Sequence, residues 1–411
     1  MTNNDFYRQL LGLTAPWTVA RVELDVSSQE VRVFVEHDHS PLLCPECAQP
    51  ALGYDAREER RWRHLDTCQF KTFLVARTPR VSCPTHGVKT VSASWCEPRS
   101  RFTLAFECFA IAVLRAAGVQ AKAAGLLRIG AGQIHDIMER AVVRGLSRRD
   151  RNEIIPDVSL DEKSFHKGHS YITVLGDSRG KRILDLVESR TIAATENLLQ
   201  EGLSPSQREQ VASVSMDMWP AFAAAKDRVL PWAQTVHDRF HVASYLNGAV
   251  DLTRRDEHKK LIKAGDPTLS RSKWYWLISP ENLTDKQRGL FDVLQSQDLE
   301  TAKVWAFKEA FREFFVAGGV TEGEAFFSNW YAQALALGNK HLTKVAKMLQ
   351  EHLPGLLAYL EHHTSNAIAE GLNGQIQLIK ARSRGFRRFH NFRIAILFFL
   401  GKLELNPQGI S

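Results

Sequence analysis

Short apolar runs alternate with segments of helical period in the middle of the chain. Seven elements are expected there, in chain order: strands at 158–165, 171–175 and 182–187, a helix at 193–202, a strand at 211–216, a helix at 219–227 and a strand at 234–238. The stretch 176–180, GDSRG, has the composition of a hairpin connector. The pattern therefore predicts three antiparallel strands followed by strands that alternate with helices.

This order is that of the ribonuclease H-like fold, in which the first and fourth strands lie side by side. Asp161 lies near the end of the first strand and Asp217 directly follows the fourth. Two carboxylates held close together repel each other, and a divalent cation relieves that repulsion. The two aspartates are therefore the first candidates for a metal site.

Upstream, apolar residues recur at helical spacing over 101–116, and Gly118 ends that segment. A short Ala-rich helix at 119–127, a turn at 128–131 and a helix from about 132 to 144 follow. The arrangement is typical of a helix-turn-helix. The alternative is an ordinary three-helix unit with a solvated basic face.

Charge favours DNA binding for this segment, because residues 99–151 contain ten Lys or Arg and four Asp or Glu. Base contacts require polar side chains early in the recognition helix, which makes Gln133, His135 and Asp136 the candidates. The basic candidates for phosphate contact are Arg140, Arg144, Arg148 and Arg149.

All six cysteines lie in the first quarter of the chain: Cys44, Cys47, Cys68, Cys83, Cys96 and Cys108. Cys44 and Cys47 form one Cys-Pro-x-Cys knuckle, and Cys83 and His86 form a Cys-Pro-x-His-Gly knuckle. Two such knuckles supply a tetrahedral ligand set for structural zinc, with a strand expected between them at 69–77. A redox dithiol at the first knuckle is the alternative, but it leaves the second knuckle unexplained. The remaining cysteines are expected to be buried.

Composition restricts the class of protein. The chain has 411 residues, 44% hydrophobic, and a net charge of +7. No apolar run approaches the roughly 18 residues that a membrane span needs, and the N-terminal residues lack the pattern of a signal peptide. With cysteines confined to one region, these features predict a cytoplasmic protein without a membrane partner.

Near the C-terminus, Asn366, Glu370 and Asn373 recur at spacings that share one helix face. Amides beside a carboxylate can orient it as a metal ligand, so Glu370 is the candidate third acid, supported by the two asparagines. Residues 371–403 contain seven Lys or Arg and no acid, interleaved with phenylalanines. This tract is a candidate phosphate-binding surface: Lys380, Arg382, Arg384, Arg387 and Arg388. The alternative is a solvated basic helix end over an aromatic core.

Over nearly its whole length the chain resembles bacterial DDE-type insertion-sequence transposases of the ISL-three family. The resemblance rests on the two knuckles, the helix-turn-helix and four motifs in order: Leu160-Asp161-Glu162, Met216-Asp217-Met-Trp219, Val236-His-Asp238-Arg-Phe-His241 and Asn366 through Asn373. The four motifs in this order are specific, whereas the knuckles or the helix-turn-helix alone would not be.

The resemblance implies that Asp161, Asp217 and Glu370 bind two Mg²⁺ or Mn²⁺ ions, with Asp161 bridging them. Two-metal chemistry would then cut the element ends and join them to target DNA without a covalent protein intermediate. The implied partners are the terminal inverted repeats, the target DNA and a second copy of the chain, in the bacterial nucleoid. No phosphate-binding loop of the ATPase type is present, so no ATP requirement is expected.

Asp238 is expected to support the site as a hydrogen-bond partner, and His237 and His241 to pack or to contact DNA. Three alternatives stay open: a DNA-binding regulator with an inert ribonuclease H-like body, a structure-specific nuclease, and a zinc hydrolase built on His237 and His241.

The expected fold is thus multidomain α/β. Its parts are a zinc finger at 1–98, a helix-turn-helix at 99–151, a ribonuclease H-like catalytic domain at 152–245 and 361–411, and an all-helical insertion at 246–360.

Overall fold

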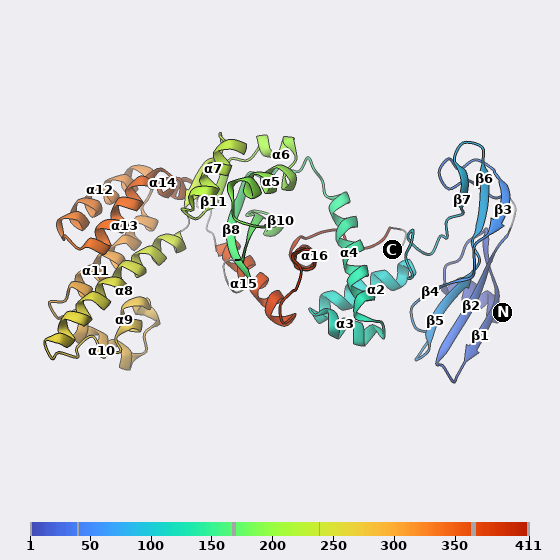
Figure 1. Cartoon of the computed structure of the whole chain (residues 1–411), viewed down its shortest axis with the longest axis horizontal. Coiled ribbons are helices and arrows are strands. Elements are labelled where there is room, and N and C mark those ends of the chain that lie inside the picture. The colour runs from blue at the N-terminus through green and yellow to red at the C-terminus, as the bar shows by residue number, and fades with distance from the viewer. Residues whose placement is uncertain (1, 39–40, 167–169, 238, 363–366, 409–411) are drawn as a thin grey trace. The chain divides into compact units, whose positions relative to one another are not determined.

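The computed structural model describes residues 2–38, 41–166, 170–237, 239–362 and 367–408, with side chains of the last range from residue 371 (Figure 1). The chain forms two compact units. The first contains Met1–Arg149, Arg382–Gly385 and Leu403–Ser411, and the second contains Asp150–Ala381 and Phe386–Lys402. No helix in the described ranges is long and apolar enough to cross a membrane.

The first unit begins with helix α1 (Asn3–Leu10) and a four-stranded sheet of order β1-β2-β5-β4. Its strands are β1 (Trp17–Asp25), β2 (Glu30–His37), β4 (Arg60–Arg63) and β5 (Lys71–Ala76). Inward-facing residues alternate with outward-facing ones along β2, and Trp17, Trp62 and Trp95 pack edge to face in the core. The strand expected at 69–77 is confirmed as β5, whereas β1 and β2 were not predicted.

A second, smaller sheet of order β3-β6-β7 adjoins the cysteine knuckles. It consists of β3 (Leu52–Ala56), β6 (Pro79–Cys83) and β7 (Gly87–Thr90), paired antiparallel. Gly87, at φ +67°, makes the turn between β6 and β7. The sheet thereby holds the second knuckle in a tight hairpin.

Three helices follow at the positions that the apolar spacing predicts: α2 (Leu104–Ala117), α3 (Gln120–Leu127) and α4 (Ala131–Arg148). Thr103 caps α2 by accepting a hydrogen bond from the backbone N–H of Phe106 at 3.2 Å. Gly118 ends α2 and Arg128 ends α3, both with left-handed backbone. Helix α4 is longer than expected and continues to Arg148.

A buried carboxylate holds α2 and α4 together. Glu107 is 1% exposed and accepts hydrogen bonds from Ser100 at 2.7 Å, Arg140 at 2.6 Å and Arg144 at 3.1 Å. Arg144 also pairs with Glu97 at 2.5 Å. A buried charge is tolerated only when it is paired and hydrogen-bonded in this way.

The segment 403–408 packs on α4. Leu403 and Leu405 are buried, and Arg144 donates to the backbone carbonyl of Leu405. Arg148 donates to the carbonyl of Asn406 at 2.6 Å. Leu403–Ser411 therefore belongs to the first unit, although the expected catalytic domain included all of 361–411.

The second unit contains a five-stranded sheet of order β10-β9-β8-β11-β12. Its strands are β8 (Asp157–His166), β9 (Ser170–Asp177), β10 (Arg182–Glu188), β11 (Ser213–Met216) and β12 (Gln234–His237). Strands β8, β9 and β10 are antiparallel, whereas β11 pairs in parallel with both β8 and β12. The predicted three-strand meander and the pairing of the first and fourth strands are both confirmed.

Three helices accompany this sheet: α5 (Ile192–Gly202), α6 (Pro205–Glu209) and α7 (Pro220–Val229). Leu160, Leu175, Leu199, Val214 and Phe222 are buried in the core that they share with the strands. This packing fixes the positions of β8 and β11, and with them the polar side chains on and directly after these strands.

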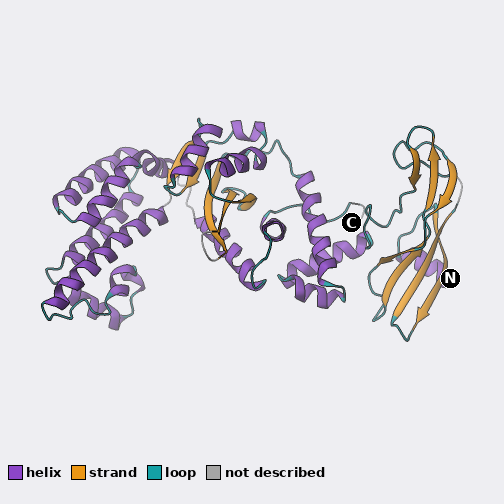
Figure 2. Ribbon diagram, viewed as in Figure 1, coloured by secondary structure: helices purple, strands orange, loops and turns teal. Residues whose placement is uncertain are grey.

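Residues 239–362 contain helices and no strand, as the pattern predicts (Figure 2). They form α8 (Arg239–Lys263), α9 (Lys273–Leu277), η1 (Pro280–Asn282), α10 (Asp285–Gln295), α11 (Glu300–Ala310), η2 (Phe311–Val316), α12 (Val320–Ala336), α13 (Lys340–Glu351) and α14 (Leu353–His362). Their core is aromatic and includes Trp276, Phe311, Phe314, Phe327 and Trp330. These helices therefore have a hydrophobic core of their own.

Two helices complete the chain, α15 (Ala367–Arg382) and α16 (Phe389–Leu400). Arg393 of α16 pairs with Asp185 of β10 at 2.6 and 2.7 Å, and Phe392 stacks on Phe165 of β8. The segment after the helical region therefore returns to the five-stranded sheet.

Replacing Gly145 with Ala is expected to destabilise the first unit. A Cβ at Gly145 would lie 2.6 Å from Cβ of Leu403, which cannot move without displacing the C-terminal segment. Overpacking of this kind costs about 1–3 kcal/mol, more than the roughly 1 kcal/mol that Ala gains over Gly in a helix. Chemical denaturation of the full chain measures the difference.

The matched control is Gly132→Ala in the same helix, where an added Cβ meets nothing within 4 Å. That variant should be unchanged or more stable. Equal stability of the two variants would mean that Leu403 does not pack against α4.

Candidate functional site

Four of the cysteine and histidine side chains converge in the first unit. Cys44, Cys47, Cys83 and His86 each offer one ligand atom, and these atoms all lie within 4.8 Å of one another. Cys44 and Cys47 belong to the turn before β3, and Cys83 ends β6. The predicted pairing of the two knuckles is therefore brought about by the fold.

The spacing of these atoms fits a tetrahedral zinc ion. The sulfurs of Cys47 and Cys83 are 3.8 Å apart, and Nδ1 of His86 is 3.7 Å from the sulfurs of both Cys44 and Cys83. Zn–S bonds of about 2.3 Å at tetrahedral angles place two sulfurs about 3.8 Å apart. Structural zinc fits this site, whereas a redox dithiol does not use the other two ligands.

A carboxylate lies near His86 beyond the four ligands. Nε2 of His86 is 3.8 Å from Glu46, and Glu46 pairs with Lys89 of β7 at 2.6 Å. Glu46 and Lys89 were not predicted, although Glu46 lies inside the first knuckle.

The other cysteines stand apart from this cluster. Cys96 and Cys108 are only partly buried, not fully as expected, and desolvation raises the pKa of the Cys96 thiol to about 11. The expectation that Cys68 is buried is wrong, because it lies exposed in a turn with φ +55°.

The second group of polar side chains lies at the centre of the five-stranded sheet. Asp161 is on β8, and Asp217 directly follows β11, the parallel neighbour of β8. Asp161 is 8% exposed. The register pairs Ser159 with Ser215, two residues before each aspartate, so Asp161 in the middle of β8 lies level with Asp217 just beyond the end of β11.

Asp161 makes three polar contacts. Its Oδ1 accepts the backbone N–H of Glu162 at 2.6 Å, and its Oδ2 accepts the side-chain amide of Asn373 and lies 3.3 Å from Nζ of Lys163. Lys163 was not predicted as a site residue. The period-two alternation of a strand places it on the same face as Asp161, which is the signal that would have found it.

Helix α15 is attached to β8 by two polar contacts. Asn373 is buried and donates to Asp161, and Lys380 donates to the backbone carbonyl of Ser164 at 2.9 Å. Glu370 lies on the same helix one turn before Asn373, and its side chain is outside the described set. Asn366 and Asp238 also lie outside the described residues.

The carboxyl of Asp217 is in an unfavourable environment for a lone charge. Burial raises its pKa, and the nearby carboxylates of Asp161 and Glu162 raise it further, whereas the backbone N–H of Trp219, at 2.9 Å, and His241 lower it. A divalent cation would relieve both the desolvation and the repulsion. The donors are hard carboxylate oxygens, the kind that Mg²⁺ prefers.

An aromatic and basic group borders Asp217. The guanidinium of Arg190 lies over the rings of Tyr171, at 4.0 Å, and Trp219, at 4.7 Å, and pairs with Glu162 at 2.9 Å. Trp219 is 38% exposed, so its indole is open to solvent beside Asp217.

His237 has a packing role. It is buried on β12, its Nδ1 is 3.3 Å from the backbone carbonyl of Met216, and its ring lies edge to face with that of His352. Burial lowers its pKa to about 4. His241 lies on α8 and acts electrostatically on Asp217, and no metal cluster among the described residues includes either histidine.

Some of the basic side chains expected to contact DNA are bound to carboxylates within the first unit, whereas others are exposed. Arg144 is buried and bound to Glu97 and Glu107, and Arg140 is bound to Glu107, so both contribute to packing inside the first unit. Gln133 accepts the N–H of Gly130 at 2.9 Å at the start of α4, close to His135. Side chains of the C-terminal tract that are exposed are Arg382, Arg384, Arg387 and Arg388.

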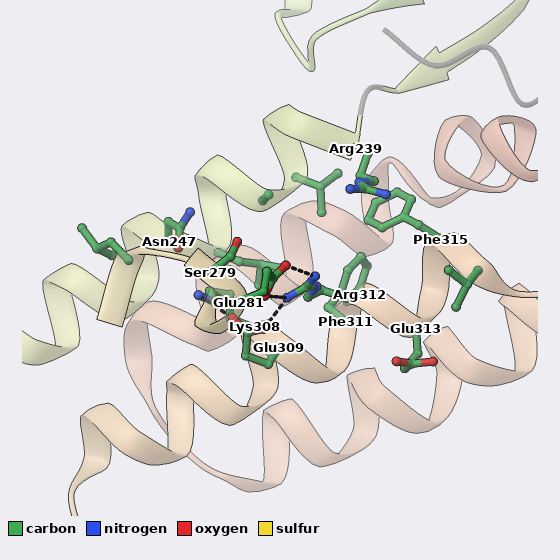
Figure 3. A pocket seen from close by; sticks show the side chains of 15 residues that line it. Arg239, Asn247, Ser279, Glu281, Lys308, Glu309, Phe311, Arg312, Glu313 and Phe315 are labelled. Atoms are coloured by element: carbon green, nitrogen blue, oxygen red, sulfur yellow. Dashed lines mark hydrogen bonds and ion pairs between the residues drawn. The ribbon is translucent and has the colours of Figure 1, made fainter. Parts of the chain in front are cut away.

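A cavity of about 500 Å³ lies among the helices of residues 239–316 in the second unit (Figure 3). Among its lining residues, Arg312 pairs with Glu281 at 2.6 Å and with Glu309 at 3.0 Å.

Comparison with known proteins places this geometry in a family. A family model for ISL3 transposases, described as a transposase, matches residues 158–396, which is more than half of the chain. This chain belongs to the ISL3 transposase family. A second model, for the zinc finger of the transposases of IS204, IS1001, IS1096 and IS1165, matches residues 40–86, which include all four zinc ligands.

Individual members of the family align over almost the full length of this transposase. The transposase for insertion sequence element IS1557 of Mycobacterium tuberculosis H37Rv is 26% identical, over 94% of this chain and 93% of its own. The transposase for IS1001 of Bordetella parapertussis is also 26% identical, over 95% of this chain and 97% of its own. The predicted family and the zinc finger are confirmed.

Replacing Cys83 with Ser should remove the structural zinc of the transposase. A serine hydroxyl is a poor zinc ligand, and the remaining three donors no longer close the tetrahedron. Metal analysis of the purified full-length variant should show a loss of most of the zinc, with earlier thermal unfolding of the first unit.

Cys68→Ser is the control, because Cys68 is exposed and outside the cluster. It should retain the wild-type zinc content. Undiminished zinc in the Cys83→Ser protein would show that the ion, if bound, is held elsewhere.

Proposed function

We propose that this transposase binds the ends of its own insertion sequence and cuts and joins DNA at a site formed by Asp161, Asp217 and Glu370. The observation that carries the proposal is the bond from Asn373 to Asp161, which attaches the helix containing Glu370 to the strand next to Asp217. The strand order β10-β9-β8-β11-β12 is the reason to propose a ribonuclease H-like fold for this part of the chain.

Asp161, Asp217 and Glu370 would hold two Mg²⁺ or Mn²⁺ ions, which supply Lewis-acid activation of the attacking oxygen and stabilisation of the leaving oxygen. Asp161 lies centrally and would be the shared ligand. Asn373 would orient Oδ2 of Asp161, and Lys163 would offset part of the negative charge of Asp161. Asp238 and Asn366 are proposed as further supports.

The substrate would be double-stranded DNA: the terminal inverted repeats and then the target. We propose that α3, the turn at Arg128 and α4 act as a helix-turn-helix, with Gln133 and His135 at base edges and Arg148 and Arg149 near phosphates. The exposed arginines of the C-terminal basic tract would contact the DNA backbone. Two copies would act together, one at each end of the element.

The proposed domains are those expected from the sequence, with two adjustments. The zinc finger, helix-turn-helix, catalytic part and helical insertion keep their places, but Arg382–Gly385 and the segment from Leu403 onward are assigned to the first unit.

Asp161→Asn should abolish DNA cleavage and strand transfer and leave DNA binding intact. The variant keeps the shape of the side chain but loses the charge that a divalent ion needs. Loss of several kcal/mol of transition-state stabilisation corresponds to a decrease of at least about a thousandfold in rate. The substrate is a duplex that contains the inverted repeat flanking the gene.

Glu188→Gln is the control for this experiment, because Glu188 is exposed on β10 of the same sheet. It should cleave at the wild-type rate. Full activity of Asp161→Asn would refute the site, binding without any cleavage by the wild type would favour a regulator, and cleavage without strand transfer would favour a nuclease.

Asn373→Ala should weaken metal binding rather than abolish chemistry. Loss of a residue that orients a metal ligand typically costs about 10–100-fold in metal affinity or activity. We expect the Mn²⁺ concentration for half-maximal cleavage to rise by that factor, while the rate at saturating Mn²⁺ changes less. Asn329→Ala, at an exposed position on α12, should leave both quantities unchanged.

A further inference from the structure

A small basic pocket in the first unit lies outside the catalytic acids and the zinc site. It has a volume of about 180 Å³ and is formed where β4 and β5 meet the beginning of α4. Its cationic lining residues are Arg61, Arg63, Lys71, Arg101 and Arg128. None of its lining residues carries a carboxylate.

The fold brings these cations together from separate elements. Arg61 and Arg63 alternate on β4, and the Arg61 guanidinium lies 4.1 Å from the ring of Phe73 on β5. The backbone carbonyl of Arg101 accepts the N–H of Arg63 at 2.9 Å. Arg128 ends α3 with left-handed backbone and donates to the carbonyl of Gln69 at 2.9 Å.

Carboxylates nearby neutralise only part of this charge. Glu30 pairs with Arg61 at 2.7 Å, and Asp66 pairs with both Arg63 and Arg128. Lys71 and Arg101 form no ion pair with a carboxylate among the described residues, and Arg101 is exposed. The pocket therefore keeps a positive surplus that an anion would balance.

Arg63 gives a second, independent indication of a ligand. It is 5% exposed, and its Nε has no hydrogen-bond partner among the described residues. Burying such a donor costs free energy unless a partner is supplied. An anion in the pocket that Arg63 lines would bring acceptor oxygens to the buried donor.

Gln133, which also lines the pocket, indicates which anion the pocket binds. Gln133, in the first turn of α4, belongs to the same lining and is the first proposed base-reading residue. Contacts to the DNA backbone fix the position of a protein on the duplex, and contacts to bases then read the sequence. A phosphate next to Gln133 would fix where α4 enters the groove.

We propose that this pocket binds one backbone phosphate of duplex DNA and thereby sets the register of α4 on the terminal repeat. The proposal rests on the proposed function, in which α4 reads DNA. Lys71 and Arg101 supply charge that no described carboxylate offsets, Arg63 supplies the buried donor, and the sheet of β4 and β5 becomes part of the DNA-binding surface.

The test compares full-length proteins on a duplex that contains the inverted repeat flanking the gene. The variant is Lys71→Gln with Arg101→Gln, and binding is measured over a series of salt concentrations. Each phosphate contact contributes about −0.9 to the slope of log affinity against log salt. We expect the variant to bind more weakly and its slope to become shallower by about one.

Arg8→Gln is the matched control, because Arg8 is an exposed arginine of the same unit on α1, which packs against β1 at the far edge of the sheet. It should keep the wild-type slope. Lys71→Arg with Arg101→Lys keeps both charges and should also keep it. Zinc content and thermal unfolding establish that each variant is folded.

A methylphosphonate scan tests the same contact if the double variant does not fold. Neutralising single phosphates of the duplex should weaken wild-type binding at one position near the base pairs read by α4. The single variant Arg101→Gln should lose sensitivity at that position and at no other.

Several results would overturn the proposal. An unchanged slope in the folded double variant, or no phosphate position at which Arg101→Gln alters sensitivity, would refute the pocket and leave the proposed function standing. An equal loss of DNA affinity in Arg8→Gln would show that the net charge of the protein, and not this pocket, determines binding. Stronger binding of an RNA duplex than of the DNA duplex would assign the pocket to another nucleic acid. No binding of the repeat by the wild type would refute the proposed function as well.

Discussion

The buried hydrogen bond from Asn373 to Asp161 joins two parts of this chain that are far apart in the sequence. The two residues are separated by a helical region with its own aromatic core, so no local preference brings them together. A buried amide and a buried carboxylate each lose hydration on folding, and pairing them recovers it. This pairing helps to hold α15, the helix that contains Glu370, against β8.

The same constraint explains why the helical region is tolerated. The helical region begins after β12, and the chain returns to the sheet at α15. Only the two ends of the helical region therefore have to be fixed to the sheet. His237, packed against His352 and Gly355 of the helical region, helps to hold the first end. The helices can therefore satisfy their own core without altering the register of β8 and β11.

Local pattern was sufficient for some parts of the molecule and insufficient for others. The strands of the five-stranded sheet and the zinc ligands could be predicted from alternation and spacing, which are properties of nearby residues. The alternation of Val31, Val33 and Val35 is an equally clear signal of β2. Arg144 could not be classified from sequence, because its carboxylate partners and the Leu405 carbonyl come from remote segments. A basic residue on a helix looks the same whether it faces phosphate or a buried glutamate.

Packing of Leu403 and Leu405 on α4 has a consequence for the order of events during synthesis. These residues leave the ribosome after every strand of the five-stranded sheet and after every helix of the chain. The first unit cannot complete its contacts around Gly145 and Arg144 until then. A nascent chain thus contains every strand of the five-stranded sheet before the packing of its N-terminal unit is complete.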